Sequence, residues 1–307
     1  MRALVTGGAG FIGSNLVDAL IAGGAETRVL DNLSTGFIDN VHPAAELIEG
    51  DVADEDVVRK AVDGVDVVYH QAALRAVLRS VEDPLATDRV NSHGTLTVLT
   101  AARDAGVRRV VYASSSSVYG GAEQLPTSES APTIPRSPYA VTKLTGEMYC
   151  RVFSELFGLE TVSLRYFNVF GPRQRPDSAY AAVIPLFIRA IRDGVPPVVH
   201  GDGRQSRSFA YISDVVEANL AAAGAPPESA QGAAYNIAGA ERKSLLDLLA
   251  VLGDVVGPVQ PPVHTDPRPG DVRHTHADLA AAARALGFRP RISFEEGLRR
   301  TAAAFGA

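Results

Sequence analysis

Short apolar runs alternate with helix-periodic segments through the first half of the chain. Six runs are rich in aliphatic and β-branched residues and are predicted to be strands: 2–5, 27–30, 46–49, 65–70, 109–113 and 161–165. Apolar positions recur every three or four residues over 11–20, 84–105 and 140–157, which predicts helices. Strands joined by helical crossovers predict an α/β fold, with a doubly wound parallel sheet covered by helices on both faces. The carboxyl ends of such strands point into one crevice, where these folds bind ligands.

The second half has a different character. From Phe170 onward, glycine and proline become dense, and the predicted helices are shorter, covering 181–193, 214–223, 244–253 and 293–304. We therefore expect a first domain of residues 1–170 and a smaller, more irregular domain of residues 171–307. No long linker separates the two halves, so we expect their segments to interleave.

Composition narrows the class of protein. The 307-residue chain is 46% hydrophobic and 21% charged, the mix of an ordinary soluble globular protein, and its net charge of −6 gives no reason to expect nucleic acid as a partner. The single cysteine, Cys150, excludes an intrachain disulfide framework and fits a reducing compartment. There is no signal-peptide pattern, and no apolar run approaches the roughly 18 residues that span a membrane, so we expect a cytoplasmic protein. His274 and His276 can share a strand face, but no third ligand accompanies them, and no metal site is predicted.

A glycine-rich loop follows the first strand and opens a helix. Gly8, Gly10 and Gly13 fit the spacing G-x-G-x-x-G, and Gly7, Gly10 and Gly13 fit G-x-x-G-x-x-G. Without side chains, the backbone amides can approach a pyrophosphate, whose charge the helix N-terminus stabilises. The flanking strand and helix make this otherwise weak signal indicate a dinucleotide site.

An acid stands where such a site needs one. Asp31 ends the second strand, where its carboxylate can accept hydrogen bonds from ribose hydroxyls and would repel a 2′-phosphate. The next residues, Asn32 and Leu33, supply no arginine to neutralise that phosphate, so NAD is predicted over NADP. Asp51 and Val52 follow the third strand and are expected to border the adenine.

Tyr139 and Lys143 are four residues apart in the predicted helix that Pro138 opens, so both lie on one face. A lysine near a tyrosine hydroxyl lowers the pKa of the phenol and makes it a candidate base. The pair alone is weak evidence, since a solvated helix face has the same pattern. The glycine loop and the serine run 114–117 at a strand end make it stronger.

Five segments together resemble extended short-chain dehydrogenases/reductases, specifically nucleotide-diphosphate-sugar 4-epimerases, over essentially the whole chain. They are 6–13 (TGGAGFIG), 113–120 (ASSSSVYG), 137–143 (SPYAVTK), 165–172 (RYFNVFGP) and 268–271 (RPGD). The resemblance implies a Rossmann domain that binds NAD and a smaller domain that binds the nucleotide sugar. It also implies that tightly bound NAD+ takes a hydride from C4 of the sugar and returns it to the other face.

The resemblance implies catalytic roles for three residues. Tyr139 removes the C4 hydroxyl proton, Lys143 holds the nicotinamide ribose and lowers the pKa of Tyr139, and Ser115 hydrogen-bonds O4 or relays its proton. The predicted cofactor contacts are Gly7, Gly10, Phe11, Ile12, Gly13, Asp31, Asn32, Ser34, Thr35, Gly36, Asp51, Val52, Gln71, Ala72, Ala73, Tyr139, Lys143 and Tyr166. The predicted substrate contacts are Arg75, Ser115, Ser116, Ser117, Tyr139, Asn168, Arg175, Ala182, Val183, Arg207, Arg268 and Thr275.

Within the family pattern, Asn168 contacts the diphosphate region, and Arg207 and Arg268 clamp the diphosphate. Ala182 and Val183 offer backbone amides and an apolar wall to a uridine, although a thymidine stays an alternative. Related 4,6-dehydratases and decarboxylating enzymes carry an acid in the positions of Ser116 and Ser117. A serine cannot supply the acid and base that water elimination needs, so simple epimerisation is predicted.

Two positions bear on the sugar. Thr275 stands where galactose-type epimerases have a large tyrosine, which leaves room for a bulkier substituent. Arg175 falls in an Arg-Pro-Asp run like that of UDP-glucuronate 4-epimerases, where the arginine pairs with the C6 carboxylate. UDP-glucuronate and UDP-galacturonate are therefore the predicted pair, with UDP-glucose or UDP-N-acetylglucosamine as the alternative. Arg175 can instead pair with Asp177 or a surface acid.

The resemblance also implies a homodimer held by a four-helix bundle. The candidate helices are 84–105 and 139–157, whose apolar faces are wider than one contact needs. A non-catalytic NAD-binding sensor is the opposing class of function, since a fold does not fix a function. Such proteins lose the tyrosine or the lysine, and both are present here. No membrane partner is expected.

Overall fold

The computed structural model describes residues 1–175, 182–267 and 272–307. A seven-stranded parallel sheet lies at its centre, in the order β11-β6-β5-β4-β1-β2-β3. Its strands are β1 (Arg2–Thr6), β2 (Glu26–Asp31), β3 (Glu46–Glu49), β4 (Val67–His70), β5 (Arg109–Ser115), β6 (Glu160–Tyr166) and β11 (Gln231–Ile237). The predicted doubly wound α/β fold is confirmed, and the strand order reverses beside β1, which places a ligand crevice at its carboxyl end.

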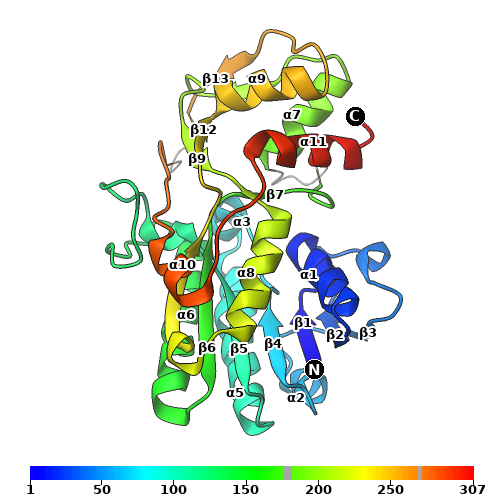
Figure 1. The fold of residues 1–307 in the computed structure, drawn as a ribbon, viewed down its shortest axis with the longest axis vertical. Helices are drawn as coiled ribbons and strands as arrows, with labels where there is room; N and C mark the ends of the chain where they lie inside the picture. Colours follow the sequence, from blue (N-terminus) through cyan, green and yellow to red (C-terminus); the bar gives the residue numbers. More distant parts are fainter. Residues whose placement is uncertain (176–181, 268–271) are drawn as a thin grey trace.

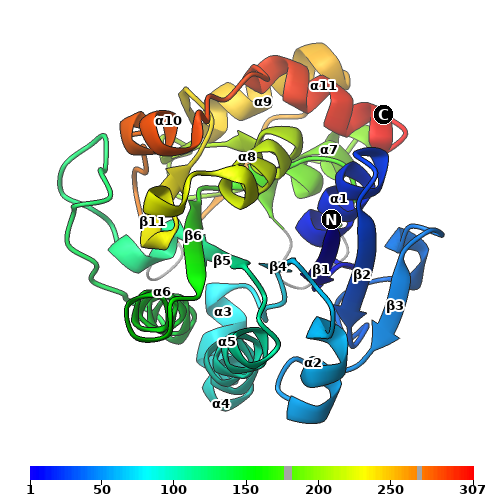
Figure 2. The same cartoon turned by 60° about the horizontal axis from the view of Figure 1, so that its bottom comes forward.

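Helices cover both faces of the sheet, as Figure 2 shows. One face carries α2 (Glu55–Val62), α5 (Gly94–Asp104) and α6 (Pro138–Phe157), and the other carries α1 (Phe11–Ala22), α8 (Ile212–Gly224) and α10 (Ala280–Leu286). The short helices α3 (Val77–Glu82) and α4 (Pro84–Asp88) lie beside α6. Two apolar clusters, one on each side of the sheet, bury the strands from both faces. Burial on two faces explains why these strands read as near-continuous apolar runs.

Two features of the elements were not predicted. The predicted helix 84–105 is confirmed as α4, a π-helical turn η2 (Arg89–His93) and α5, which follow one another without a break, and the wide turn places the Asn91 side chain against the backbone of Leu74. The seventh strand, β11, was not predicted. Its sequence begins Gln-Gly-Ala-Ala, and it is an edge strand with a register irregularity at Gly232, where φ is +73°.

The upper part of the molecule is a separate layer of short elements above the carboxyl ends of the strands (Figure 1). Its helices are α7 (Val183–Arg192), α9 (Leu245–Val255) and α11 (Phe294–Ala304). Three two-stranded sheets join β7 (Val169–Phe170) to β10 (Ala210–Tyr211), β9 (Ser206–Ser208) to β12 (Arg242–Ser244) and β8 (Val198–His200) to β13 (Val263–Thr265). The chain enters this layer after β6, returns to the sheet for α8 and β11, and enters it again. Ala181, the predicted start of α7, lies outside the described residues.

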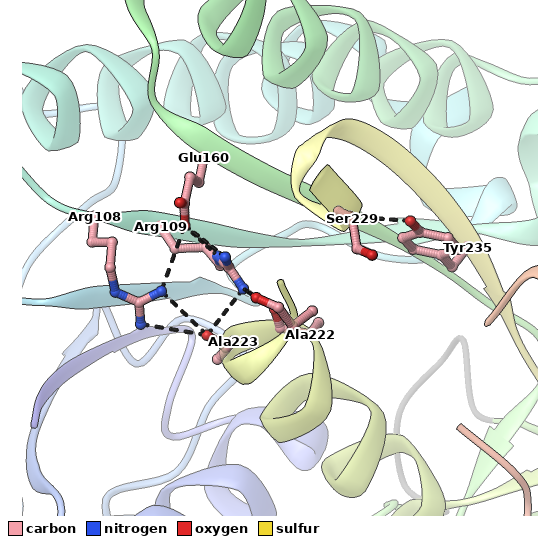
Figure 3. A network of polar contacts seen from close by, with 8 residues as sticks. Arg108, Arg109, Glu160, Ala222, Ala223, Ser229 and Tyr235 are labelled. Atoms are coloured by element: carbon pink, nitrogen blue, oxygen red, sulfur yellow. Dashed lines mark hydrogen bonds and ion pairs between the residues drawn. The ribbon is translucent and has the colours of Figure 1, made fainter. Parts of the chain in front are cut away.

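Buried charge fixes the opposite end of the sheet. Arg109, 1% exposed at the start of β5, donates from Nη1 to the carbonyl oxygens of Ala222 (2.8 Å) and Ala225 (2.7 Å) at the end of α8. Its Nε donates to Glu160 at the start of β6 (2.8 Å), as drawn in Figure 3. The last carbonyls of a helix lack partners within it, so this guanidinium caps α8 and ties it to two strands.

Candidate active site

A cleft of about 1050 Å³ lies at the carboxyl ends of the strands. Its wall includes the glycine loop, the ends of β2, β4, β5 and β6, the start of α6 and the segment 168–175. A second cavity of about 550 Å³ lies beside α7 and shares Asn168, Gln174, Ala182 and Arg207 with the cleft. The predicted crevice therefore exists, and it reaches the upper layer of the molecule.

The glycine loop is closely packed around its missing side chains. Gly7 has φ of +70°, and a Cβ there would lie 2.7 Å from the backbone nitrogen of Ala72. A Cβ at Gly13 would overlap the carbonyl oxygen of Gly7. Helix α1 begins at Phe11 after Gly10, which has no side chain to cap the helix, so the amides of the first turn stay available to an anion. These features fit a dinucleotide pyrophosphate.

Asp31 is held in a fixed orientation at the end of β2. Its Oδ2 accepts from the backbone nitrogen of Ala9 (3.0 Å) and its Oδ1 from that of Leu33 (2.8 Å). Each carboxylate oxygen keeps a lone pair, which fits acceptance from two ribose hydroxyls. Asn32 accepts from Ser34 Oγ (2.6 Å), which shapes the loop that borders this carboxylate.

Most of the predicted cofactor contacts lie on the wall of the cleft: Gly7, Gly10, Phe11, Ile12, Gly13, Asp31, Asn32, Ser34, Thr35, Val52, Gln71, Ala72, Ala73, Tyr139, Lys143 and Tyr166. Gly36 and Asp51 do not. Gly36 packs against Ala9, where a Cβ would come within 2.8 Å of the Ala9 Cβ. Asp51 accepts from the backbone of Ala53 (2.9 Å) and contacts Asn32 (3.4 Å). Both therefore shape the loops behind the site.

Helix α6 carries the tyrosine and the lysine in its first two turns. Ser137 caps it by accepting from the backbone nitrogen of Ala140 (3.2 Å), and Pro138 occupies the first turn. The Lys143 ammonium donates to the carbonyl of Ala113 on β5 (2.8 Å) and lies 5.9 Å from the centre of the Tyr139 ring. Burial lowers the pKa of Lys143 to about 7, and the charge of Glu147 opposes this effect.

Burial raises the pKa of Tyr139, and a hydrogen bond with Ser115 and the charge of Arg75 oppose that rise. Burial also lowers the pKa of Lys143, which favours its neutral amine near neutral pH. The lowering of the Tyr139 pKa by Lys143 stays a prediction. Ala76, next to Arg75, has φ of +96°, a strained conformation for a residue with a side chain. Arg75 is therefore a further cation, besides Lys143, whose charge favours the phenolate of Tyr139.

Ser115 can donate its proton toward Tyr139. Its Oγ accepts from both the backbone nitrogen (3.2 Å) and the hydroxyl (2.9 Å) of Ser117. With both lone pairs engaged, the serine O–H remains as a donor. Ser116 and Ser117 form a single 3-10 turn, η3 (Ser116–Tyr119), on the wall of the cleft.

Asn91 supports this site, and the sequence reasoning missed it. It is buried in the π turn, where its Oδ1 accepts from Leu74 N (2.8 Å) and its Nδ2 donates to Leu74 O (3.1 Å). The same Nδ2 donates to Thr142 Oγ1 on α6 (3.1 Å). Asn91 thus joins the segment before Arg75 to the helix of Tyr139. The neighbouring residues Arg89, Ser92 and His93 are also polar, so the sequence carries no signal that marks Asn91.

A buried ion pair lies behind the lysine and was also missed. Arg165 donates to both carboxylate oxygens of Glu147, at 2.9 Å and 2.7 Å, and each side chain is 8% exposed. Ser114 on β5 bonds the same carboxylate. Since Glu147 is one turn beyond Lys143 on α6, this pair fixes the helix to β5 and β6 and places a negative charge near the ammonium.

Eight of the predicted contacts that belong to the substrate alone lie on the wall of the cleft: Arg75, Ser116, Ser117, Asn168, Arg175, Ala182, Arg207 and Thr275. Val183 lines the second cavity instead, as the first residue of α7. Arg268 lies outside the described residues, as does Asp177. Among the described atoms, the Thr275 hydroxyl and the Gln174 Oε1 are buried without a hydrogen-bond partner.

Two negative findings concern the described residues. They contain no group of three or more His, Cys, Asp and Glu side chains placed to hold a metal ion. Within the same ranges, every helix is too short or too polar to cross a bilayer.

Comparison with known proteins agrees with this geometry. The profile of the NAD dependent epimerase/dehydratase family matches residues 3–238. A UDP-glucose 4-epimerase of Mycolicibacterium smegmatis is 38% identical over 98% of this chain and 97% of its own length. The structure of a UDP-N-acetylglucosamine 4-epimerase from Methanobrevibacter ruminantium, in complex with UDP-N-acetylmuramic acid, superposes with a TM-score of 0.93 at 40% identity and covers 99% of this chain and 97% of that one. A variant UDP-glucuronic acid 4-epimerase from Bacillus cereus, in complex with UDP-4-deoxy-4-fluoro-glucuronic acid and NAD, has a TM-score of 0.92 at 32% identity and covers 100% and 99%.

Proposed function

The chain belongs to the NAD dependent epimerase/dehydratase family, and we propose that it epimerises UDP-glucuronate to UDP-galacturonate at C4. The three relatives compared above are UDP-sugar 4-epimerases, and the proposed reaction class follows from theirs. One observation carries the proposal: Ser115, Tyr139 and Lys143 share a cleft with the glycine loop, Asp31 and Arg175.

The residues divide the work of the reaction. When bound, NAD+ accepts a hydride from the sugar and returns it. The amides at the start of α1 hold its pyrophosphate, and Asp31 accepts from its adenosine ribose. Tyr139 removes the proton from the C4 hydroxyl, and the Ser115 hydroxyl bonds the oxygen on which charge develops. Lys143 would contact the nicotinamide ribose, and its hydrogen bond to the carbonyl of Ala113 keeps its position fixed.

Arg175 supports the uronic acid as substrate. A guanidinium on the wall of a cleft can form paired, charge-assisted hydrogen bonds with a carboxylate at C6, whereas a neutral CH2OH leaves those donors poorly used. The same hydrogen bonds would hold the carboxylate of the 4-keto sugar so that its breaking C–C bond is poorly aligned with the carbonyl π system. This orientation would suppress loss of CO2. The positions of Ser116 and Ser117 lack the acid that dehydration needs, so epimerisation is the proposed outcome.

UDP-N-acetylglucosamine or UDP-glucose is the second candidate. Thr275, on the wall of the cleft, leaves space for an N-acetyl group, and the relative at 40% identity is a UDP-N-acetylglucosamine 4-epimerase. This candidate uses the same catalytic residues and differs only in what faces C2 and C6 of the sugar.

The test is turnover of the three UDP-sugars, and of dTDP-glucose for the base, by purified protein without added cofactor. We expect bound NAD, fastest turnover of UDP-glucuronate, and no pentose product. Tyr139→Phe should reduce kcat by about 10²- to 10⁴-fold while NAD stays bound, since it removes the base alone. Full activity of that variant, or the absence of turnover with every sugar, would contradict the proposal and favour a sensor.

Arg175→Ala tests the choice of sugar, with Arg175→Lys as its matched control. The alanine variant should raise KM for UDP-glucuronate about 10- to 100-fold, in line with a lost charged hydrogen bond, and leave UDP-glucose almost unchanged. The lysine variant should recover part of the loss, because it keeps the charge without the fork. An equal loss on both sugars counts against the carboxylate.

We also infer a cytoplasmic homodimer. The one cysteine, Cys150, is buried and fits a reducing compartment. The outer face of α6 exposes Met148 (58%) and Leu156 (71%), and Leu85 on the neighbouring α4 is 83% exposed. Large exposed apolar side chains on neighbouring helices are typical of a subunit interface.

A further inference from the structure

The segment Gly171–Arg175, called the strap below, joins the upper layer to the dinucleotide-binding half. Near its middle, Arg173 forms an ion pair with Asp18 on α1, with 2.8 Å between Nη2 and Oδ2. Asn15, also on α1, approaches the carbonyl oxygen of Pro172 (3.5 Å). Arg173 adopts φ of +69°, a conformation that is uncommon outside glycine. The strap is therefore held in an unusual shape against the helix that follows the glycine loop.

The end of the strap rests on an aromatic ring. The Cζ atom of Arg175 lies 4.0 Å from the centre of the Phe37 ring, well inside the range of a cation–π contact. Phe37 belongs to the loop after β2, and its backbone nitrogen donates to the carbonyl oxygen of Ala9 in the glycine loop (3.0 Å). The nitrogen of Ala9 in turn donates to Asp31. The backbone that carries the ring is thus tied to the groups that fit the cofactor.

Stacking and carboxylate binding use different parts of a guanidinium. A guanidinium can rest its flat face on an aromatic ring while its edge donates hydrogen bonds to a carboxylate. A long arginine side chain loses considerable rotamer freedom when it is immobilised on binding. A ring that already holds the guanidinium over the cleft reduces that loss, so it should strengthen binding without any contact between the ring and the sugar.

We propose that Phe37 is a positioning residue that holds Arg175 over the cleft and thereby sets the affinity for the nucleotide sugar. The proposal rests on the proposed function in one respect, that Arg175 contacts the substrate. The sequence analysis assigned the loop after β2 to cofactor binding alone. The proposal gives this loop a second role, in the affinity for the substrate.

A contact between the Phe37 ring and the bound dinucleotide is the competing explanation, because Phe37 lines the same cleft as Asp31. The two explanations differ in what depends on Arg175. A positioning role disappears when Arg175 is absent, whereas a cofactor contact does not.

The test is a double-mutant cycle on the NAD-loaded protein. The Kd for UDP-glucuronate is measured by calorimetry in wild type, Phe37→Leu, Arg175→Ala and the double variant, with Phe37→Tyr as the conservative control. We expect Phe37→Leu to weaken binding about two- to fivefold, the effect of a partly exposed cation–π contact, and Phe37→Tyr to bind like wild type. In the Arg175→Ala background, Phe37→Leu should have no effect.

Three results would overturn the proposal. One is the same loss from Phe37→Leu with and without Arg175. A second is a lower content of bound NAD in Phe37→Leu, measured after denaturation, that accounts for the weaker binding. A change in kcat alone, with Kd unchanged, would also exclude a positioning role in binding.

The results that would contradict the proposed substrate differ from those that would contradict the role of Phe37. If Arg175→Ala weakens UDP-glucuronate and UDP-glucose equally, the preference for a carboxylate is wrong, but the coupling between Phe37 and Arg175 is still measured with either sugar. If the coupling is absent while Arg175→Ala selectively weakens UDP-glucuronate, Phe37 is not the positioning residue and the proposed substrate stands.

Discussion

Lys143 has a charge that depends strongly on its surroundings. It is 3% exposed, its ammonium lies 5.1 Å from the centre of the Tyr112 ring on β5, and burial lowers its pKa to about 7. Glu147 and Cys150 on α6 push that pKa upward, and His70 on β4 stays neutral because burial and the lysine charge lower its own pKa to about 3. The ammonium near the reacting phenol is thus only partly protonated at neutral pH.

A pH-dependent stability follows from this burial. In the unfolded chain a lysine titrates near pH 10.4, so between about pH 7 and 10 the unfolded state binds more protons, and stability rises with pH across that window. Lys143→Met removes this pH-dependent contribution to stability, because methionine carries no titrating group. At saturating NAD, its stability relative to wild type should be highest at and below about pH 7, by as much as a few kcal/mol, and the difference should narrow toward pH 10.

Urea unfolding of both proteins across this window measures the difference, and Lys60→Met on the exposed side of α2 is the control. The control should follow wild type at every pH, since Lys60 is exposed on α2 and its replacement leaves the buried amine of Lys143 in place. A pH-independent difference between Lys143→Met and wild type would show that the buried amine does not titrate.

Residues with local signatures could be predicted, and those that depend on three-dimensional neighbours could not. Spacing along one strand or helix is enough to recognise the glycine loop, Asp31 and the pair Tyr139 and Lys143. The effect of Arg75 on Tyr139 depends on burial, and the contact of Phe37 with Arg175 joins segments far apart in the chain. No spacing rule within the sequence encodes such pairs.

Helix α6 approaches β5 closely because Gly146 has no side chain. A Cβ at that position would overlap the hydroxyl of Tyr112, whose ring lies against Lys143. Gly146→Ala should therefore destabilise the protein by about 1–3 kcal/mol despite the better helix propensity of alanine. Because α6 carries Tyr139, kcat should fall as well, by up to about 100-fold.

Gly224→Ala is the matched control for this prediction. Gly224 ends α8, and a Cβ there would meet nothing within 4 Å, so the substitution should be neutral or stabilise the fold by up to about 1 kcal/mol. Thermal unfolding and initial rates of both variants provide the comparison. If the two variants have the same free energy of unfolding, α6 can move away from β5 without destabilising the protein, which contradicts the prediction.

The elements also mark where the sequence pattern stops being informative. The first six strands were predicted, and the prediction is confirmed; all but the edge strand β3 carry aliphatic runs because both sheet faces bury them. β11 is an edge strand of small and polar residues, and its pairing with β6 places it in the sheet. The π turn in 89–93 keeps the apolar period of a helix, so periodicity alone could not distinguish it.

At the scale of the whole molecule, α6 has two working faces. Its inner face carries Tyr139, Lys143 and Glu147 toward the sheet, and its outer face exposes Val141, Met148, Val152 and Leu156 at helical spacing. Figure 2 shows α3, α4 and α5 on the same side of the molecule as α6. A second copy that buries this face would stiffen the helix on which the site is built, which connects the proposed dimer to the cleft.

Charge on the outer face of α6 should therefore separate the subunits. In a twofold interface each substitution occurs twice, and burying a leucine contributes about 1.5–3 kcal/mol, so Met148→Glu with Leu156→Glu should yield a monomer. Sedimentation should give twice the 32.3 kDa of one chain for wild type and a single chain for the variant. Val195→Glu, at a residue that is 49% exposed after α7, should leave the mass unchanged. A wild-type protein that sediments as one chain at every concentration, or a charged variant that keeps the doubled mass, would place the interface elsewhere or exclude it.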